Sequence, residues 1–139
     1  MVGDEVGATV DEMTIDDDEI VLAIPAKPEF LRLARIAAAD VGSRCGLAYE
    51  EVDDLRIAID ELCHAIMAPS ISGDGSRTLR IHFTALADAV EIEGTCPGDI
   101  TPRLDELSAA ILAAVADEHE LSGGDGTSRF RMVKRVRLP

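Results

Sequence analysis

The sequence predicts an α+β fold, a two-layer sandwich in which a mixed, mainly antiparallel sheet carries its helices on one face. Two strand-like segments, 77–86 and 90–94, follow each other across a short turn, as in an antiparallel hairpin. Helical patterns separate the first strand from this hairpin and the hairpin from the last strand, giving the order β-α-α-β-β-α-(β)-β. The 139 residues, 47% of them hydrophobic, suit a single domain.

The chain begins with an acidic stretch. Residues 1–18 hold seven of the 27 acidic residues and none of the 13 basic ones, without a sustained period. This composition predicts a disordered tail, and the alternative is an autoinhibitory or partner-reading arm. Residues 19–26, "EIVLAIPA", are short, β-branched and closed by Pro25, so they predict the first strand and the start of a domain spanning 19–139.

Two helices follow. The first opens at Pro28, whose fixed φ suits a helix start, and Gly42 and Gly46 are expected to end it. The second begins near "AYEEVDD" and ends before Pro69. Apolar side chains recur at helical spacing in both. They are Phe30, Leu33, Ala34, Ala37 and Val41 in the first helix, and Val52, Leu55, Ile59, Leu62, Cys63 and Ile66 in the second.

The second half of the chain alternates strand and turn signals. Leu79, Ile81 and Phe83 alternate with polar residues, which predicts a half-exposed strand. The remaining segments are assigned by composition and periodicity. They are loops at 70–76 and 95–102, a helix at 103–121 that leads into a short strand at its end, a turn at 122–126 and a closing strand at 127–138.

Composition narrows the partners. The net charge of −14 and the pI of about 4.4 disfavour nucleic acid and anionic membranes, and the absence of Trp removes the best stacking platform for bases. No apolar run of about 18 residues and no basic leader occur, so we expect a cytoplasmic protein. The three cysteines, Cys45, Cys63 and Cys96, are expected to be reduced, buried thiols.

The stretch "LRIAIDELCHAI" places Asp60 and Glu61 inside an apolar helix. Adjacent helical residues point about 100° apart, so the two carboxylates face different sides. Glu61 lies on the flank of the apolar stripe, from which it either enters a cleft or remains a solvated acid. A zinc site is not expected, because the Cys and His residues lack ligand spacing. They are Cys63, His64, His82 and Cys96.

The C-terminal strand reverses the sign of the chain's charge. Five basic residues lie within nine positions, and they either pair with the protein's own acids or hold an acidic ligand such as a nucleotide phosphate. They are Arg129, Arg131, Lys134, Arg135 and Arg137.

The order of elements, together with "VDDLRIAIDELCHAI", resembles the RsbW-like anti-sigma factors of the serine-kinase type, within the histidine-kinase-like (Bergerat) ATPase superfamily. The resemblance covers about residues 18–138 and is closest to UsfX-type anti-sigma-F factors. The family pattern in this helix is close to L-R-L-A-V-x-E-x-x-x-N-A, and the matching residues are Leu55, Arg56, Ile57, Ala58, Ile59 and Glu61. "LAIPAKPEFLRLARIAAADV" and "GTSRFRMVKRV" also fit, with less specificity.

The resemblance implies an ATP site in which Glu61 takes the position of the water-handling glutamate. The position of the Mg²⁺-binding Asn is Ala65, which offers no oxygen ligand. The position of the adenine-reading Asp is Gly94, and the glycines of the following loop fall on Cys96 and Gly98. ATP and Mg²⁺ are therefore expected to bind weakly if at all, and no metal site is assigned.

Two further matches complete this implied site. Thr127 corresponds to the Thr that opens the family's last strand. The second Gly-rich stretch falls on "DELSAA", where Glu106 and Ser108 stand in place of glycines and Glu106 would repel phosphate.

The resemblance implies a regulator that binds a sigma factor, an anti-anti-sigma protein, or both, through a degenerate ATPase fold without kinase activity. It also implies a homodimer and places partner contacts around the first helix, at Arg32 and Arg35. The alternatives are an active serine kinase that uses Asp60 or Asp99 for Mg²⁺, and a structural subunit of an intact paralogue.

Overall fold

The computed structural model describes residues 18–68 and 76–137. Its centre is a five-stranded sheet with the order β1-β2-β3-β5-β4, in which each pair of neighbouring strands is antiparallel. The strands are β1 (Glu19–Pro25), β2 (Thr78–Ala85), β3 (Ala89–Gly98), β4 (Glu118–Ser122) and β5 (Gly126–Arg135). The predicted α+β class is confirmed.

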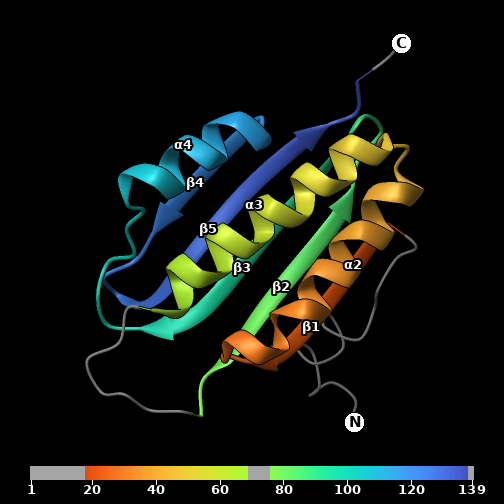
Figure 1. Ribbon diagram of the computed structural model, residues 1–139. Coiled ribbons are helices and arrows are strands. Elements are labelled where there is room, and N and C mark those ends of the chain that lie inside the picture. Colours follow the sequence, from red (N-terminus) through yellow and green to blue (C-terminus); the bar gives the residue numbers. More distant parts are fainter. Residues whose placement is uncertain (1–17, 69–75, 138–139) are drawn as a thin grey trace, which may run out of the picture.

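The helices lie together on one face of this sheet (Figure 1). They are the 3₁₀ turn η1 (Pro28–Phe30) and the α-helices α2 (Leu31–Arg44), α3 (Tyr49–Met67) and α4 (Glu106–Val115). Helix α3 lies between α2 and α4, so it has a flank facing each of them (Figure 1). No helix of the described segments meets the bilayer-spanning criteria of length and apolarity.

The core forms between α3 and the sheet. The predicted apolar stripe of α3 is buried throughout, from Val52 to Ile66. The predicted inward face of β2 is also confirmed, because Leu79, Ile81 and Phe83 have no exposed surface. Each such side chain contributes about 1.5–3 kcal/mol on burial, so α3 is held firmly and its two flanks have fixed positions.

Helix α2 differs from its prediction in part of its buried face and in the residue at which it ends. Of the predicted face, Ala34 and Val41 are buried, but Leu33 is 43% exposed. The other buried residues of the helix are Leu31, Ala38 and Gly42. Gly42 does not end the helix; it lies inside it, where an added Cβ would be 3.0 Å from Leu47 Cδ1. The chain leaves the helix at Gly46, which has the positive φ of 93° that favours glycine.

Two boundaries after β2 were wrong. The predicted loop 95–102 begins too early, because β3 continues to Gly98 in register with β5, and this pairing outweighs a loop-like composition. The predicted helix 103–121 is too long, since α4 ends at Val115 and Ala116 is extended. The short strand expected at its end is present as β4, which pairs with β5.

The basic residues of β5 and the segment after it pair with the protein's own acids, as one of the two sequence interpretations predicted. Lys134 is 2% exposed, and its Nζ lies 3.2 Å from Asp54 Oδ2 and 3.0 Å from the carbonyl oxygen of Val115. This bond joins β5 to α3 and to the end of α4. The other pairs are Arg129 with Asp125, Arg131 with Glu91 and Glu118, Arg135 with Glu118, and Arg137 with Glu51 and Asp117.

The acidic segment 1–17 and most of the loop expected at 70–76 lie outside the described residues, so their predicted states stay predictions.

Candidate functional site

A hollow of about 370 Å³ lies between the C-terminal half of α3 and the start of α4. Glu61 and Ala65 both line it, because residues four apart share one face of a helix. The opposite wall comes from the connection between β3 and α4 and from the first turn of α4. Its residues are Ile100, Thr101, Arg103, Leu104, Asp105 and Ser108. The structure therefore brings together two of the predicted positions, Glu61 and Ala65, with Ser108 across from them.

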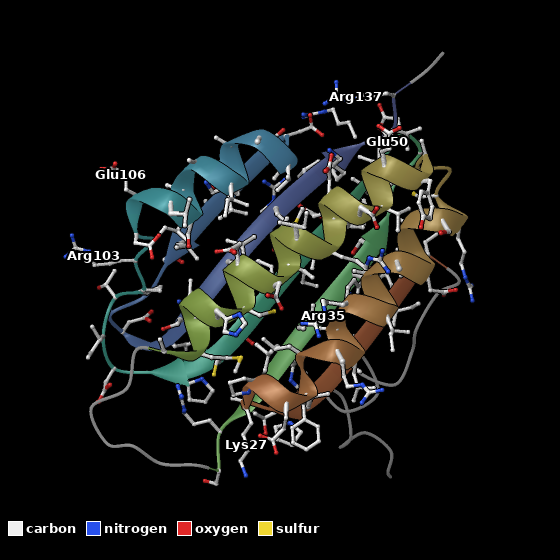
Figure 2. All side chains as sticks on the ribbon, in the orientation of Figure 1. Lys27, Arg35, Glu50, Arg103, Glu106 and Arg137 are labelled. Carbon is white, nitrogen blue, oxygen red and sulfur yellow. The ribbon has the colours of Figure 1, made fainter. Side chains whose placement is uncertain are left out.

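The charges of this α3–α4 hollow do not suit a polyanion. Asp105 is the N-cap of α4, and its Oδ1 accepts a hydrogen bond from the Ser108 backbone N–H at 2.7 Å. That hydrogen bond lowers the pKa of the Asp105 carboxyl, which therefore stays ionised. The cap occupies a helix N-terminal donor that a phosphate would otherwise use. Arg103 lines the hollow, but its side chain and that of Glu106 extend into solvent at this end of α4 (Figure 2).

The predicted positions on β3 lie elsewhere. Gly94 and Cys96 face the helix layer inside the core and do not line the hollow. An added Cβ on Gly94 would be 2.2 Å from Cε2 of Phe130, so the Phe130 ring occupies the space into which a side chain at position 94 would project. Cys96 is fully buried, and Gly98 is the last residue of the strand.

The predicted hydroxyl at the start of β5 faces the opposite side of the sheet. Thr127 pairs with Pro97, whereas its neighbour Ser128 pairs with the buried Cys96 and is itself fully buried. Oγ of Ser128 has no hydrogen-bond partner among the described residues. Sequence reasoning missed Ser128, although its alternation with Phe130 and Met132 places all three on the inner face.

The second acid of the central helix lies on the other flank of α3. Asp60 Oδ1 lies 2.6 Å from Arg35 Nη1, across the gap between α3 and α2. It is thus directed away from the α3–α4 hollow and cannot replace an oxygen ligand at Ala65. No cluster of three or more His, Cys, Asp or Glu side chains suited to a metal occurs in the segments 18–68 and 76–137.

The Arg35–Asp60 pair lies in a groove of about 490 Å³ between α2 and α3, which we call the α2–α3 groove. Its lining combines isoleucines with arginines: Ile36 is 60% exposed and Ile57 44%. Figure 2 shows Arg35 between the two helices. Arg32 lines the groove without an ion pair to a described carboxylate, and Glu61 borders it as well. Exposed aliphatic surface with arginines is typical of a protein-docking surface.

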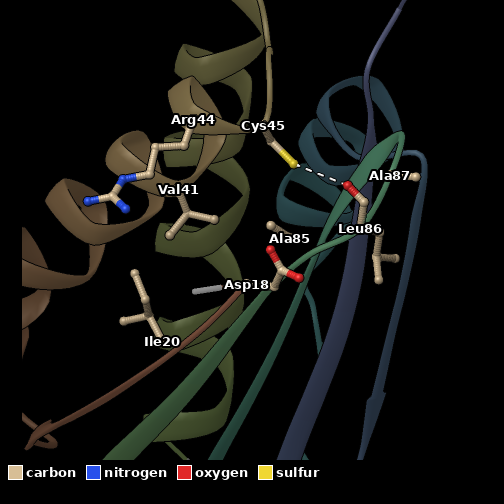
Figure 3. A pocket seen from close by; sticks show the side chains of 8 residues that line it. All are labelled: Asp18, Ile20, Val41, Arg44, Cys45, Ala85, Leu86 and Ala87. Atoms are coloured by element: carbon tan, nitrogen blue, oxygen red, sulfur yellow. Dashed lines mark hydrogen bonds between the residues drawn. The ribbon is translucent and has the colours of Figure 1, made fainter. Parts of the chain in front are cut away.

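A third hollow, of about 500 Å³, lies at the C-terminal end of α2 beside the turn between β2 and β3 (Figure 3). Cys45 Sγ lies 3.5 Å from the Leu86 carbonyl oxygen and 3.3 Å from that of Ala89. Desolvation raises the pKa of this thiol, and burial likewise raises the pKa of Cys63 and of Cys96. Protonated thiols are poor nucleophiles. Cys63 and Cys96 are buried as predicted, whereas Cys45 is only partly buried, so the prediction of a buried thiol is wrong at this position.

Known proteins resemble this chain in sequence. No protein-family model matches it. The serine-protein kinase RsbW of Listeria monocytogenes serotype 4a is 27% identical over 109 residues, which cover 76% of this chain and 69% of the relative. RsbW of Bacillus subtilis is 32% identical over 82 residues (59% and 51%), and RsbW of Bacillus pumilus 38% over 77 residues (54% and 48%).

The fold also has a solved counterpart. A crystal structure of the RsbU and RsbW domains of a Mycobacterium tuberculosis protein superposes with a TM-score of 0.67 at 15% identity. The match covers 87% of this chain, which spans 33% of that longer chain. Together with the sequence relatives, this likeness confirms the predicted RsbW-like resemblance and the fold that it implied.

Proposed function

We propose that this RsbW-like chain is a binding regulator of the anti-sigma type, which holds a sigma factor, an anti-anti-sigma protein, or both, and does not transfer phosphate. The observation that carries the proposal is the pairing of Glu61 with Ala65 in the α3–α4 hollow. The family's catalytic acid position is filled, but the neighbouring metal-ligand position offers only a methyl group.

The metal is the first missing part. Mg²⁺ binds through oxygen ligands, and Asp60, the nearest other carboxylate on α3, is engaged by Arg35 on the far flank. Metal bridging and phosphate positioning supply most of the catalysis of phosphoryl transfer, at several kcal/mol for each part removed. The residues present therefore do not fit a catalytic Mg·ATP complex.

The nucleotide's own contacts are the second missing part. The position that the resemblance assigns to the adenine reader is Gly94, and the Phe130 ring takes up the space beside it. At the phosphate end, the ionised Asp105 and the cap that it forms replace a glycine cradle. Both ends of the expected nucleotide thus meet groups that exclude or repel it.

We place the partner surface at the α2–α3 groove. Arg35 is oriented by Asp60, and the exposed Ile36 and Ile57 flank it, so a partner would find a positioned cation among apolar contacts. Arginines that become buried at the centre of an interface are among the residues that carry most of the binding energy. A homodimer, which the resemblance also implies, remains part of this proposal.

The second candidate function is an active ATP-dependent kinase of an anti-anti-sigma protein. The relatives' name, serine-protein kinase, and the position of Glu61 in the hollow favour it. It requires a magnesium ligand other than residue 65, and Asp99, at the end of β3 and outside the hollow's lining, is the remaining carboxylate to test.

The deciding experiment is a calorimetric titration of the protein with ATP and Mg²⁺, together with a phosphate-transfer assay on candidate anti-anti-sigma proteins. We expect no measurable heat and no transfer above background, while an RsbW relative serves as the active control. Ala65→Asn is the matched variant, and it should not restore binding because the adenine and phosphate ends stay blocked. A Kd in the micromolar range, about −8 kcal/mol, or transfer by the unmodified chain contradicts the proposal.

A further inference from the structure

The basic residues of this protein divide into two groups. Eight of the 13 form ion pairs with carboxylates of the described residues. The other five form none: Lys27, Arg32, Arg77, Arg80 and Arg103. Three of these five, Lys27, Arg77 and Arg80, line a single hollow. Such clustering of unpaired cations is unexpected in a chain of net charge −14.

This hollow, which we call the basic hollow, has a volume of about 570 Å³ and lies where β1 ends and β2 begins. Besides the three cations, the hydroxyl-bearing Ser76 and Thr78 line it, and none of its described lining residues is a carboxylate. The four other hollows on the described surface each contain at least one carboxylate. Among these five hollows, the basic hollow is therefore the one whose described charged lining residues are all basic.

The local structure explains why these three cations form no ion pair with a described carboxylate. The Arg77 guanidinium donates to the carbonyl oxygens of Pro97, at 2.9 Å, and Met67, which are neutral acceptors. Arg80 lies in register with Ala23 on β1 and Thr95 on β3, so neither residue directly opposite it is an acid, and it forms no ion pair with a described carboxylate. Lys27 is exposed just after β1 (Figure 2). The strand pairing holds the cations in place, so the attraction for anions is built into the sheet edge.

We infer that the basic hollow binds an acidic peptide, and that its occupant is the chain's own N-terminal segment. Residues 4–17 contain six carboxylates and no base, and they join the sheet at Asp18, the residue before β1. Strand β1 is the edge of the sheet, so its outer side is unpaired among the described strands. The inference does not depend on the proposed function.

The length of the segment fits this path. An extended chain rises about 3.3 Å per residue, so seven residues running back along β1 cover about 23 Å, the length of that strand. This places Asp11 and Glu12 beside the end of β1, where Arg80 lies opposite Ala23. Asp4 and Glu5 then have enough chain to reach Lys27 and Arg77. Tethering raises the effective concentration to the millimolar range, so weak ionic contacts suffice.

A spin label on the segment tests this assignment in the full chain. The nitroxide is attached at Ala8→Cys, in a background in which Cys45→Ser removes the partly exposed thiol. NMR then follows the amide signals of Ala23, Thr78 and Arg80, which broaden when the label is close. We expect these signals to be at least halved by the label. The broadening should disappear in Lys27→Glu/Arg80→Glu, and in about 0.5 M NaCl, where the Debye length is only about 4 Å.

The matched control is Arg32→Glu/Arg103→Glu, which makes the same charge change at unpaired cations outside the basic hollow. Broadening that persists there and vanishes in Lys27→Glu/Arg80→Glu supports the inference. The inference is overturned by any of three results. The broadening is lost equally in both variants, no signal of β1 or β2 is broadened, or the broadened signals belong to the α2–α3 groove instead. Asp74→Asn serves as a second control, because Asp74 lies outside the described residues and close in sequence to Arg77. If this variant shows markedly stronger broadening, Asp74 is the occupant of the basic hollow in the unmodified chain and the inference is overturned.

Discussion

The two flanks of α3 carry different chemistry. Toward α2, Arg35 and Asp60 form an ion pair at 2.6 Å beside the exposed Ile36 and Ile57. Toward α4, the position that the resemblance assigns to the metal ligand is Ala65, and Asp105 presents an ionised carboxylate. Glu61 borders both hollows. Under the proposed function, one helix thus separates a surface that binds protein from one that does not hold nucleotide.

The proposed function implies that the site chemistry of this fold can change while its core is kept. The inward stripe of α3, including Leu55, Ile59 and Leu62, is fully buried and lies between the two flanks. Substitutions on the flanks leave that stripe and its packing intact. The likeness in fold covers 87% of the chain, whereas activity must be argued for each flank separately.

The largest expected effect comes from Gly94→Asp, which places an Asp at the position that the resemblance assigns to the adenine reader. An added Cβ at position 94 would meet the Phe130 ring at 2.2 Å, and the carboxylate would be buried without a partner. Overpacking alone costs about 1–3 kcal/mol, and the buried charge adds to this, so we expect a loss of more than about 3 kcal/mol in the free energy of unfolding. Urea denaturation followed by circular dichroism measures it.

Gly94→Ala separates the two contributions, since it keeps the clash and omits the charge. Gly94→Asp/Phe130→Ala removes the clash and should recover part of the lost stability relative to Gly94→Asp. If Gly94→Asp folds as stably as the unmodified chain, or gains affinity for ATP, the nucleotide flank is intact and the contrast between the flanks is wrong.

A smaller effect is expected on the other flank, and it should separate stability from binding. The Arg35 and Asp60 side chains are 41% and 33% exposed, so a double-mutant cycle with Arg35→Ala and Asp60→Ala should give a coupling of only about 0.2–1 kcal/mol. Arg35→Glu should nevertheless weaken binding of the partner sigma factor by about tenfold, equivalent to about 1.4 kcal/mol. Fluorescence anisotropy with purified sigma factor measures the affinity.

Arg44→Glu is the matched control for Arg35→Glu. Arg44 lies on the same helix and pairs with Asp40, but it does not line the α2–α3 groove. Its substitution should leave the affinity unchanged. A similar loss in Arg44→Glu would indicate a general charge effect rather than a contact in the groove.

The sequence predicted what depends on local periodicity. The buried stripe of α3 and the inward face of β2 follow from spacing alone, and both are confirmed. Contacts between distant segments were not predictable in this way. Gly42 looked like a helix end but packs against Leu47 and Leu55, and β3 extends past its predicted end because β5 pairs with it.

The same limit applies to the candidate site: positions on one helix were predictable from spacing, but contacts between separate elements were not. Glu61 and Ala65 share a hollow because they are one helical turn apart. The separation of Thr127 from that hollow depends on the register of β5 against β3, which places Ser128 inward instead. The Arg35–Asp60 pair joins residues 25 positions apart, so no local pattern indicates it.

The smallest expected effect is the pH dependence of the α4 cap. The Ser108 N–H holds the pKa of Asp105 below its usual value of about 3.9, so the folded state favours the ionised form. The stabilisation is therefore present above pH 4 and is lost as the pH falls through the lower folded pKa. Asp105→Asn keeps a capping oxygen without the charge. It should melt slightly below the unmodified chain at pH 7, and the difference should shrink as the pH is lowered below about 4, as thermal denaturation over a series of pH values would show.

The same variant tests why the α4 flank fails to hold nucleotide. If repulsion by Asp105 were the only obstacle, Asp105→Asn would bind ATP and Mg²⁺ in the calorimeter. We expect no binding, because residue 65 still lacks an oxygen ligand and Phe130 still fills the space beside Gly94. If this single change restores ATP binding, the charge of Asp105 alone keeps nucleotide out of the α4 flank, and the rest of the nucleotide site is still present there.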